Sequence, residues 1–216
     1  MRVIVTRPRA QAEPLAERLR ELGHDVVLCP LIEIEPLGDG PVDVDGYDWV
    51  VVTSANGAGE LARRRTGTMP RLAAVGPGTA EALRRHGLEP ELVPVISTQE
   101  GLLEELPRPA GRVLMAAAEG ARTLLADELG ADFVPLYRTR LLRPAEPPQG
   151  DLVVLASGSA ARAFAALELD IPAVSIGPQT TIAAEAAGLE VVAEAETHDL
   201  DGLVAAVRSA RCSSPS

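Results

Sequence analysis

The stretch AAVGPGTAEALRRHGLEPELVP, residues 73–94, returns later in the chain as VSIGPQTTIAAEAAGLEVVAE, residues 174–194. Both copies contain a short apolar run, Gly-Pro, a threonine, a helical stretch closed by glycine, and a second short apolar run. Thr79 corresponds to Thr180, a separation of 180 − 79 = 101 residues. This order of signals predicts a β-turn-α-β unit. The chain therefore builds the same unit twice.

The repeat extends beyond these two copies. WVVVTSANGAGEL aligns with LVVLASGSAARAF, which places Ser54 opposite Ser157, and STQEGLLEEL resembles HDLDGLVAAV. RVIVTRPRAQAEPLAERLRELG aligns more loosely with RVLMAAAEGARTLLADELG. We expect two similar α/β units.

Short β-branched runs alternate with helical patterns along almost the whole chain. This alternation predicts an α/β fold with parallel sheets flanked by helices. Several of the helices end at glycine, as a left-handed C-cap prefers: Gly23, Gly87, Gly130 and Gly188. The expected strands are 2–6, 25–29, 49–53, 72–76, 90–94, 112–116, 132–136, 151–156, 173–177 and 190–194. The expected helices include 10–22, 57–64, 78–86, 119–129, 159–167, 179–187 and 200–209.

Two segments do not fit a division into two consecutive domains. LIEIEPL (31–37) and LYRTRLL (136–142) alternate apolar and polar residues, as half-exposed strands do, and no crossover helix follows either one in the expected place. Paired with each other, they form a two-stranded β connector that makes the first domain discontinuous. We therefore predict a discontinuous domain from 1–34 and 143–216, and an inserted domain from 38–136.

Composition excludes several classes of function. The net charge of −11 argues against binding nucleic acid, and the 2% aromatic content provides no base-stacking platform. No apolar run approaches the roughly 20 residues of a membrane span. The N-terminus enters a strand directly and not a signal peptide, so we expect a cytoplasmic protein with no membrane partner. Nothing in the sequence indicates more than a monomer.

The sequence contains no familiar cofactor motif. Cys29 and Cys212 have no metal-binding spacing, and the three histidines are scattered, so we expect no metal. GPGTAE matches only half of a dinucleotide fingerprint, because Glu81 occupies the place of the third glycine and Gln179 replaces Gly78 in the second copy. A nucleotide-linked enzyme is thus disfavoured, and we expect no organic cofactor.

Small polar residues and glycines gather where strands end and helices begin. Ligands of open parallel sheets bind at the carboxyl ends of the strands, and helix N-termini attract anions. For any single serine, threonine or asparagine at these places, N-capping is the favoured explanation over ligand binding. Five such loops together favour a site for carboxylate or phosphate groups. The loops contain Thr6 and Arg7; Ser54, Ala55 and Asn56; Gly76 and Thr79; Ser157, Gly158 and Ser159; and Gly177 and Thr180.

Tyr137 stands out in PLYRTRLLRP, beside Arg138, Arg140 and Arg143. A tyrosine with a pKa near 10 is protonated at neutral pH and donates a proton or a hydrogen bond. The alternative is a strand tyrosine that packs its ring against a sheet edge.

Read in order, these motifs resemble the uroporphyrinogen-III synthase family. The resemblance runs from VTRPRAQAEPLAERLRELGHDVVLCPLIEIEPL through DWVVVTSANG, AAVGPGTAEALRRHGL, PLYRT and LASGSAARAF to IGPQTTIAAEAAGL. Each motif alone is weak, whereas their order and spacing are specific. The resemblance implies two α/β domains joined by a two-stranded connector, with the substrate in the cleft between them.

The resemblance also implies a reaction. Its enzymes take hydroxymethylbilane, a linear tetrapyrrole with eight carboxylates, invert ring D, and close the macrocycle to uroporphyrinogen III with loss of water, without a cofactor. The family's tyrosine falls on Tyr137, which would assist departure of the substrate hydroxyl. Its serine and threonine loop positions fall on Ser157, Thr79 and Thr180, which we expect to act largely through backbone N–H groups.

One departure concerns the segment AAAEG at 116–120, where many members carry an arginine. This departure weakens any assignment of a substrate contact to residues 116–120. The alternative to an enzyme is a non-catalytic module that uses the same cleft to bind or sense an anionic metabolite, because nothing in the fold forces catalysis.

Overall fold

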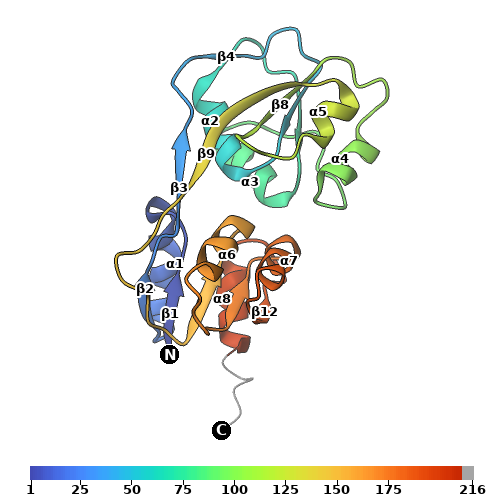
Figure 1. Ribbon diagram of the computed structural model, residues 1–216. Coiled ribbons are helices and arrows are strands. Elements are labelled where there is room, and N and C mark those ends of the chain that lie inside the picture. Colours follow the sequence, from blue (N-terminus) through green and yellow to red (C-terminus); the bar gives the residue numbers. More distant parts are fainter. Residues whose placement is uncertain (211–216) are drawn as a thin grey trace. The chain divides into compact units, whose positions relative to one another are not determined.

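A computed structural model describes residues 1–210 of the chain. The contacts divide the chain into two compact units, which are described separately (Figure 1). Unit 1 comprises Met1–Glu33 together with the described residues from Arg140 onward, and unit 2 is Ile34–Thr139. Unit 1 is thus built from two separated stretches of sequence.

Unit 1 contains a five-stranded sheet in which every neighbouring pair is parallel. The strand order reverses beside β1, because β2 lies on one side of it and β10 on the other. Such a reversal is a topological switch point, where the loops after two adjacent strands diverge and leave room for a ligand. The order across the sheet is β12 (Val191–Glu194), β11 (Ala173–Ser175), β10 (Leu152–Leu155), β1 (Arg2–Val5) and β2 (Asp25–Leu28).

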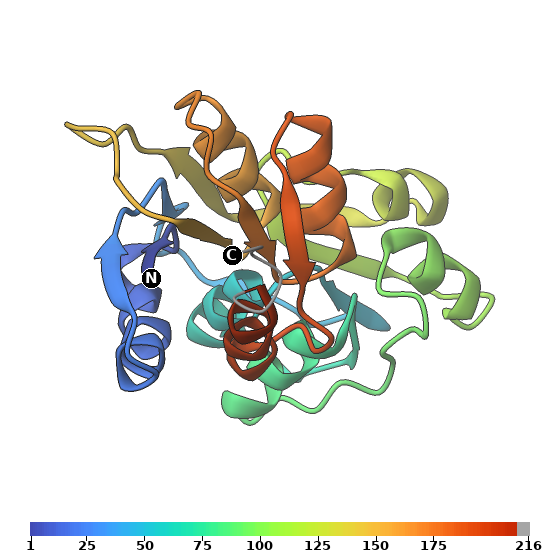
Figure 2. The same ribbon diagram turned by 90° about the horizontal axis from the view of Figure 1, so that it is seen from below.

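Helices cover both faces of this sheet (Figure 2). On one face, α1 (Arg9–Glu21) and α8 (Leu200–Ala210) bury residues such as Leu15 and Leu203 against Val3 and Val154. On the other face, α6 (Gly158–Ala165) and α7 (Pro178–Ala186) pack Phe164 against Ile4 and its neighbours. Because both faces are buried, the strands are apolar at almost every position and do not alternate.

Unit 2 has a similar five-stranded sheet, in which four strands are parallel and the fifth lies at one edge. Parallel strands β9, β8, β5 and β7 form its sheet, and β3 extends the sheet at the β9 edge. Its switch point lies between β5 and β8. Unit 2 also contains a separate sheet of two short parallel strands, β4 (Val42–Asp43) and β6 (Arg65–Thr66). The sheet order is β3 (Ile32–Pro36), β9 (Asp132–Leu141), β8 (Val113–Ala118), β5 (Trp49–Val52) and β7 (Arg71–Ala74).

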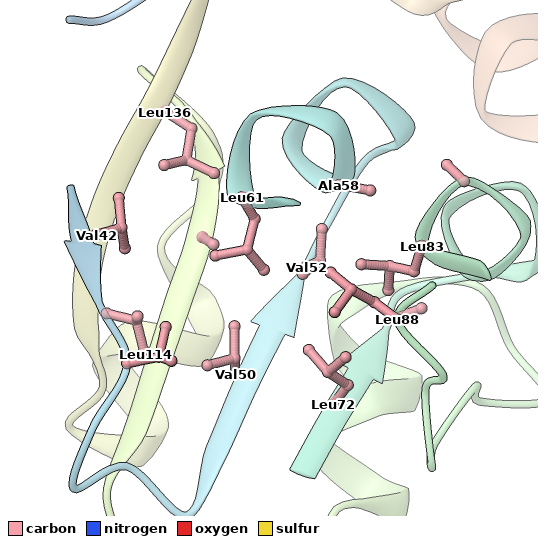
Figure 3. Close-up of a cluster of buried hydrophobic side chains, with 14 of the residues drawn as sticks. Val42, Val50, Val52, Ala58, Leu61, Leu72, Leu83, Leu88, Leu114 and Leu136 are labelled. Atoms are coloured by element: carbon pink, nitrogen blue, oxygen red, sulfur yellow. The ribbon is translucent and has the colours of Figure 1, made fainter. Parts of the chain in front are cut away.

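The core of unit 2 lies on both sides of the sheet. Figure 3 shows one side, where α2 (Ala55–Arg64) and α3 (Pro77–Arg85) bury Leu61 and Leu83 over Val50 and Val52. The opposite side holds α4 (Gln99–Glu105) and α5 (Leu124–Leu129), with Leu102 and Leu125 packed around Val51. Packing against the sheet stabilises these helices, since isolated helices of this length are only marginally stable in water.

Strands β3 and β9 form an antiparallel ribbon at residues 31–37 and 136–142. The Leu37 N–H donates to the Leu136 carbonyl at 2.9 Å, and the Leu142 N–H donates to the Leu31 carbonyl at 2.8 Å. The alternating pattern in both segments predicted this pairing, and the strand order confirms it. Arg138 lies 2.9 Å from Glu35 across the ribbon, and Arg140 pairs with Glu33.

Most predicted elements occur within a few residues of their expected ends, with two corrections. The strand expected at 90–94 is wrong: Leu92 forms only an isolated bridge with Ala73, and Pro90 and Pro94 lack the N–H that a ladder needs. The helix expected at 119–129 is too long. β8 continues to Ala118 and α5 begins only at Leu124, after Gly120 turns the chain at a φ of 74°.

All four predicted glycine C-caps are confirmed. Gly23, Gly87, Gly130 and Gly188 have φ values of 79°, 72°, 61° and 85°, the left-handed region that favours glycine.

Candidate functional site

The loop after β5 lies at the switch point of unit 2. Ser54 caps the N-terminus of α2, where its side-chain oxygen accepts the Gly57 N–H at 3.0 Å. A Cβ on Gly57 would lie 3.1 Å from that oxygen and 3.5 Å from the Ala116 carbonyl of β8. The loop is therefore packed closely against the neighbouring strand. Ala55, another expected site residue, is the first residue of α2.

Tyr137 reaches this loop from β9. Its hydroxyl lies 2.9 Å from the Ser54 hydroxyl, and the ring is 6% exposed. The register between β8 and β9 shifts just before this point, so that Ala118 is opposite Tyr137 while Ala117 is opposite Pro135. Neighbouring strand residues normally face opposite sides of a sheet, yet Leu136 and Tyr137 both pack in the α2–α3 core. The bulge explains how both side chains reach that face.

The surroundings of Tyr137 keep its hydroxyl protonated. Burial raises the pKa of Tyr137 above its ordinary value, and hydrogen bonds from Ser54 and Asn56 oppose this in part. Tyr137 is therefore a neutral acid at pH 7, held beside the N-terminus of α2. The structure thus brings Tyr137 to two residues of a loop that the sequence suggested independently, Ser54 and Asn56.

The loop after β7 has a Gly-Pro turn. Gly76 is the N-cap of α3, and Ser97 covers it so closely that a Cβ there would lie 2.9 Å from the Ser97 hydroxyl. The Thr79 side chain is buried, at 6% exposure. Its N–H donates to the Gly76 carbonyl at 3.1 Å.

Unit 1 repeats that turn after β11. The Thr180 N–H donates to the Gly177 carbonyl at 2.9 Å, and His198 lies over Gly177, where a Cβ would be 2.7 Å from the imidazole Cδ2. Ser97 and His198 were not predicted as site residues. The aligned motifs STQEG and HDLDG carried the signal, because they place these two residues opposite each other.

The expectation that Thr79 and Thr180 act through their own N–H groups does not fit these turns. Each N–H already donates to a glycine carbonyl. In the part of the chain that the structure describes, the N–H groups of Gly78 and Gln179 in the same first turns have no protein acceptor. These two backbone groups are the better anion donors.

The switch point of unit 1 combines Thr6, Arg7 and the loop after β10. Ser157 caps α6 by accepting the Ala160 N–H at 3.2 Å, and its hydroxyl lies 3.1 Å from that of Ser159. Gly158 follows as the first residue of α6; a Cβ there would lie 3.0 Å from the Ala183 side chain.

Thr6 differs from the expectation. It is 0% exposed, and its hydroxyl donates to the Val154 carbonyl of β10 at 2.9 Å. Its side chain therefore joins two strands at the switch point and is inaccessible to a ligand.

Arg7 follows Thr6 in the same loop. Its guanidinium donates to the Gln11 side chain at 3.3 Å, while its Nε is buried and, among residues 1–210, has no hydrogen-bond partner. Burial lowers the pKa of the Arg7 guanidinium from its ordinary value. By contrast, Arg138 and Arg140 are neutralised by the ribbon glutamates.

Residues 1–210 contain no cluster of three His, Cys, Asp or Glu side chains that could hold a metal ion. Cys29 is buried with a free thiol whose pKa is raised by burial, and Cys212 lies outside the described residues. No helix within residues 1–210 is long and apolar enough to cross a membrane.

Comparison with known proteins gives a consistent result. The family model for uroporphyrinogen-III synthase HemD matches residues 13–205. The uroporphyrinogen-III synthase of Synechococcus elongatus is 27% identical over 95% of this chain and 93% of its own length. A relative in Methanocaldococcus jannaschii is 28% identical. The aligned part covers 64% of this chain and 62% of that protein.

A solved structure supports the fold. The crystal structure of a mutant uroporphyrinogen III synthase from Thermus thermophilus covers 99% of this chain at a TM-score of 0.68 and 18% identity, with all of that chain matched. At this identity the likeness concerns the fold alone.

Proposed function

The chain belongs to the uroporphyrinogen-III synthase family, cyclising hydro-lyases of porphyrin biosynthesis, and on this basis we propose that it converts hydroxymethylbilane to uroporphyrinogen III. The reaction closes a linear tetrapyrrole with inversion of ring D and releases one water. The observation that carries this proposal within the molecule is the buried Tyr137 hydroxyl, 2.9 Å from Ser54 at the switch point of unit 2.

Tyr137 is the proposed general acid. Its proton would pass to the hydroxyl of the substrate as the carbon–oxygen bond breaks, so that the group leaves as water and a delocalised cation remains. Ring D then attacks through its substituted carbon, the older bond from that carbon to the bridge of ring C breaks, and the bridge rejoins ring D at its unsubstituted α-carbon. The proton lost from that α-carbon balances the one consumed. A buried phenol suits this task because its raised pKa keeps it protonated at neutral pH.

Ser54 and Asn56 are the proposed positioning residues for Tyr137. The Ser54 oxygen is fixed by the Gly57 N–H, which leaves its own proton and a lone pair for the phenol. This arrangement restricts the direction in which the Tyr137 hydroxyl points. Ala55 lies between these two side chains at the start of α2 and contributes backbone only.

The remaining loops are proposed to bind the acidic side chains of the substrate. The substrate has eight carboxylates, whereas this chain carries a net charge of −11, so binding must rely on local donors. The N-termini of α3, α6 and α7 offer backbone N–H groups and the positive end of the helix dipole. These loops contain Gly76, Thr79, Ser157, Gly158, Ser159, Gly177 and Thr180.

Small residues suit these loops for a steric reason. Gly76 and Gly177 are covered by Ser97 and His198, and any larger side chain would displace those neighbours. Gly78 and Gln179, which follow in the same turns, are exposed at the helix starts. Orientation of the substrate by such contacts is the main demand of the reaction, because ring D must attack through one carbon and not another.

A coupled assay tests this proposal. Freshly generated hydroxymethylbilane is supplied to the protein, the products are oxidised, and the type I and type III uroporphyrin isomers are separated. Predominance of type III supports catalysis with ring inversion. Type I alone, which spontaneous closure gives, would overturn the catalytic proposal and leave the anionic-metabolite binding module as the reading to pursue.

A further inference from the structure

We propose that Arg7 is a substrate-binding residue whose guanidinium binds one carboxylate of the tetrapyrrole, and that the described residues, 1–210, leave it without a carboxylate partner for this purpose. This inference rests on the proposed function and adds the contact that a charged ligand requires in unit 1.

Arg7 is held firmly at the ligand-binding edge of the sheet. The preceding residue, Thr6, is anchored to Val154 of the adjacent strand by its side-chain hydrogen bond of 2.9 Å. The following residue is Pro8, whose ring fixes φ and which serves as the N-cap of α1. The Arg7 backbone is therefore constrained from both sides at the switch point of unit 1.

The hydrogen-bonding of Arg7 is incomplete. Its guanidinium makes a long hydrogen bond of 3.3 Å to Gln11, and within residues 1–210 the buried Nε has no acceptor. Ten other arginines within residues 1–210 have carboxylate partners. Arg2, at the opposite end of the same strand, pairs with Asp25 at 2.7 Å.

A partly buried cation with an unused donor is costly for the folded protein. Burial removes water from the guanidinium, and its lowered pKa records that loss. A carboxylate from a ligand would restore the missing interaction, and the planar fork of arginine binds carboxylates in a bidentate manner. The unpaired Arg7 guanidinium thus lowers the stability of the ligand-free protein but can bind a carboxylate without first breaking an internal ion pair.

Two variants and one control test the proposal. Arg7→Met keeps an apolar stem and removes the charge, Arg7→Lys keeps the charge without the fork, and Arg2→Met removes an exposed pair from the same strand. The measurements are KM and kcat for hydroxymethylbilane, the melting temperature, and the dissociation constant for uroporphyrinogen III by calorimetry under anaerobic conditions.

We expect Arg7→Met to raise KM and the dissociation constant about 10- to 100-fold, the loss of a charge-assisted hydrogen bond, with a smaller change in kcat. Its melting temperature should equal or exceed that of the wild type, because an unsatisfied buried donor is gone. Arg7→Lys should give an intermediate KM. Arg2→Met should leave KM and the dissociation constant unchanged.

Unchanged KM and dissociation constant in Arg7→Met would overturn the proposal. If Arg7→Met fails to fold, Arg7→Lys decides: wild-type binding by that variant would show that the buried Nε contributes nothing to the ligand. The proposed function fails separately. A wild type that binds uroporphyrinogen III through Arg7 but yields only type I product would refute catalysis and support this contact.

Discussion

The hydroxyl of Tyr137 lies 2.9 Å from the hydroxyl of Ser54, although 83 residues separate them in the sequence. Ser54 also accepts the Gly57 N–H, so one hydroxyl both caps α2 and contacts the phenol. This pairing joins the middle of β9 to the switch point of unit 2. The hydrogen bond to Ser54 explains how the polar hydroxyl of Tyr137 can be buried in the core of unit 2.

Replacement of Tyr137 by phenylalanine should lower kcat by roughly 10²-fold or more, because general-acid catalysis contributes about 10²- to 10⁴-fold. The fold should remain, since the ring stays in the core and only a hydrogen bond worth about 1 kcal/mol is lost. Tyr47→Phe is the matched control: it removes an exposed hydroxyl that donates to Asp132 at 2.7 Å. Wild-type turnover in Tyr137→Phe, measured by type III formation, would remove the phenol from the mechanism.

Ser54→Ala should reduce both stability and turnover. Loss of the N-cap costs about 1 kcal/mol of unfolding free energy, and the less restricted phenol should lower kcat. Thr98→Ala removes a comparable cap, in which Thr98 accepts the Gly101 N–H at 3.1 Å. Within residues 1–210 the Thr98 hydroxyl also hydrogen-bonds with Glu100 and has no tyrosine partner. Thr98→Ala should match Ser54→Ala in urea denaturation and keep wild-type kcat.

A double-mutant cycle separates the two roles of Ser54. If Ser54 acts through the phenol, the effect of Ser54→Ala on kcat should vanish in the Tyr137→Phe background. Additive effects on kcat would mean that Ser54 acts independently of Tyr137.

Alkaline pH should reveal the buried phenol. Burial raises the pKa of Tyr137 in the folded protein, so the unfolded chain loses this proton first as the pH rises. The contribution to stability is complete below a pH of about 10 and falls as the pH approaches the folded pKa. The unfolding free energy of the wild type should therefore decline more steeply above pH 10 than that of Tyr137→Phe. The unfolding free energies of both proteins are measured by denaturation between neutral and alkaline pH. If they depend on pH in the same way, the raised pKa of Tyr137 is contradicted.

Gly202→Ala and Gly101→Ala should each destabilise the protein by about 1–3 kcal/mol through overpacking. A Cβ would lie 2.0 Å from the Thr197 carbonyl in the first case and 2.2 Å from the Ile96 carbonyl in the second, and backbone cannot easily move aside. Gly59→Ala in α2 is the control, because its nearest neighbour is His86 at an ordinary 3.6 Å. Helix propensity should make that change stabilising by up to about 1 kcal/mol. Equal effects in thermal denaturation would refute the steric account.

Local signals in the sequence were enough for most of the architecture. Glycine C-caps, serine N-caps and apolar runs depend on neighbouring residues, so Gly87, Ser54 and the strand at Trp49–Val52 could be predicted directly. Where local signals were ambiguous, the prediction failed. Apolar residues between Pro90 and Pro94 indicated a strand that lacks the donors for a ladder.

The sequence alone determined the α/β class, the duplicated units and the loops that carry polar residues. These features depend on hydrophobic periodicity and turn residues, which involve positions close together in the chain. Only the tertiary structure decided how those residues are used. It buried Thr6 between two strands, left Arg7 Nε without a hydrogen-bond partner among residues 1–210, and brought Tyr137 to Ser54 through a bulge in β9. These outcomes depend on contacts between distant segments and on strand register, which hydrophobic spacing along one segment does not specify.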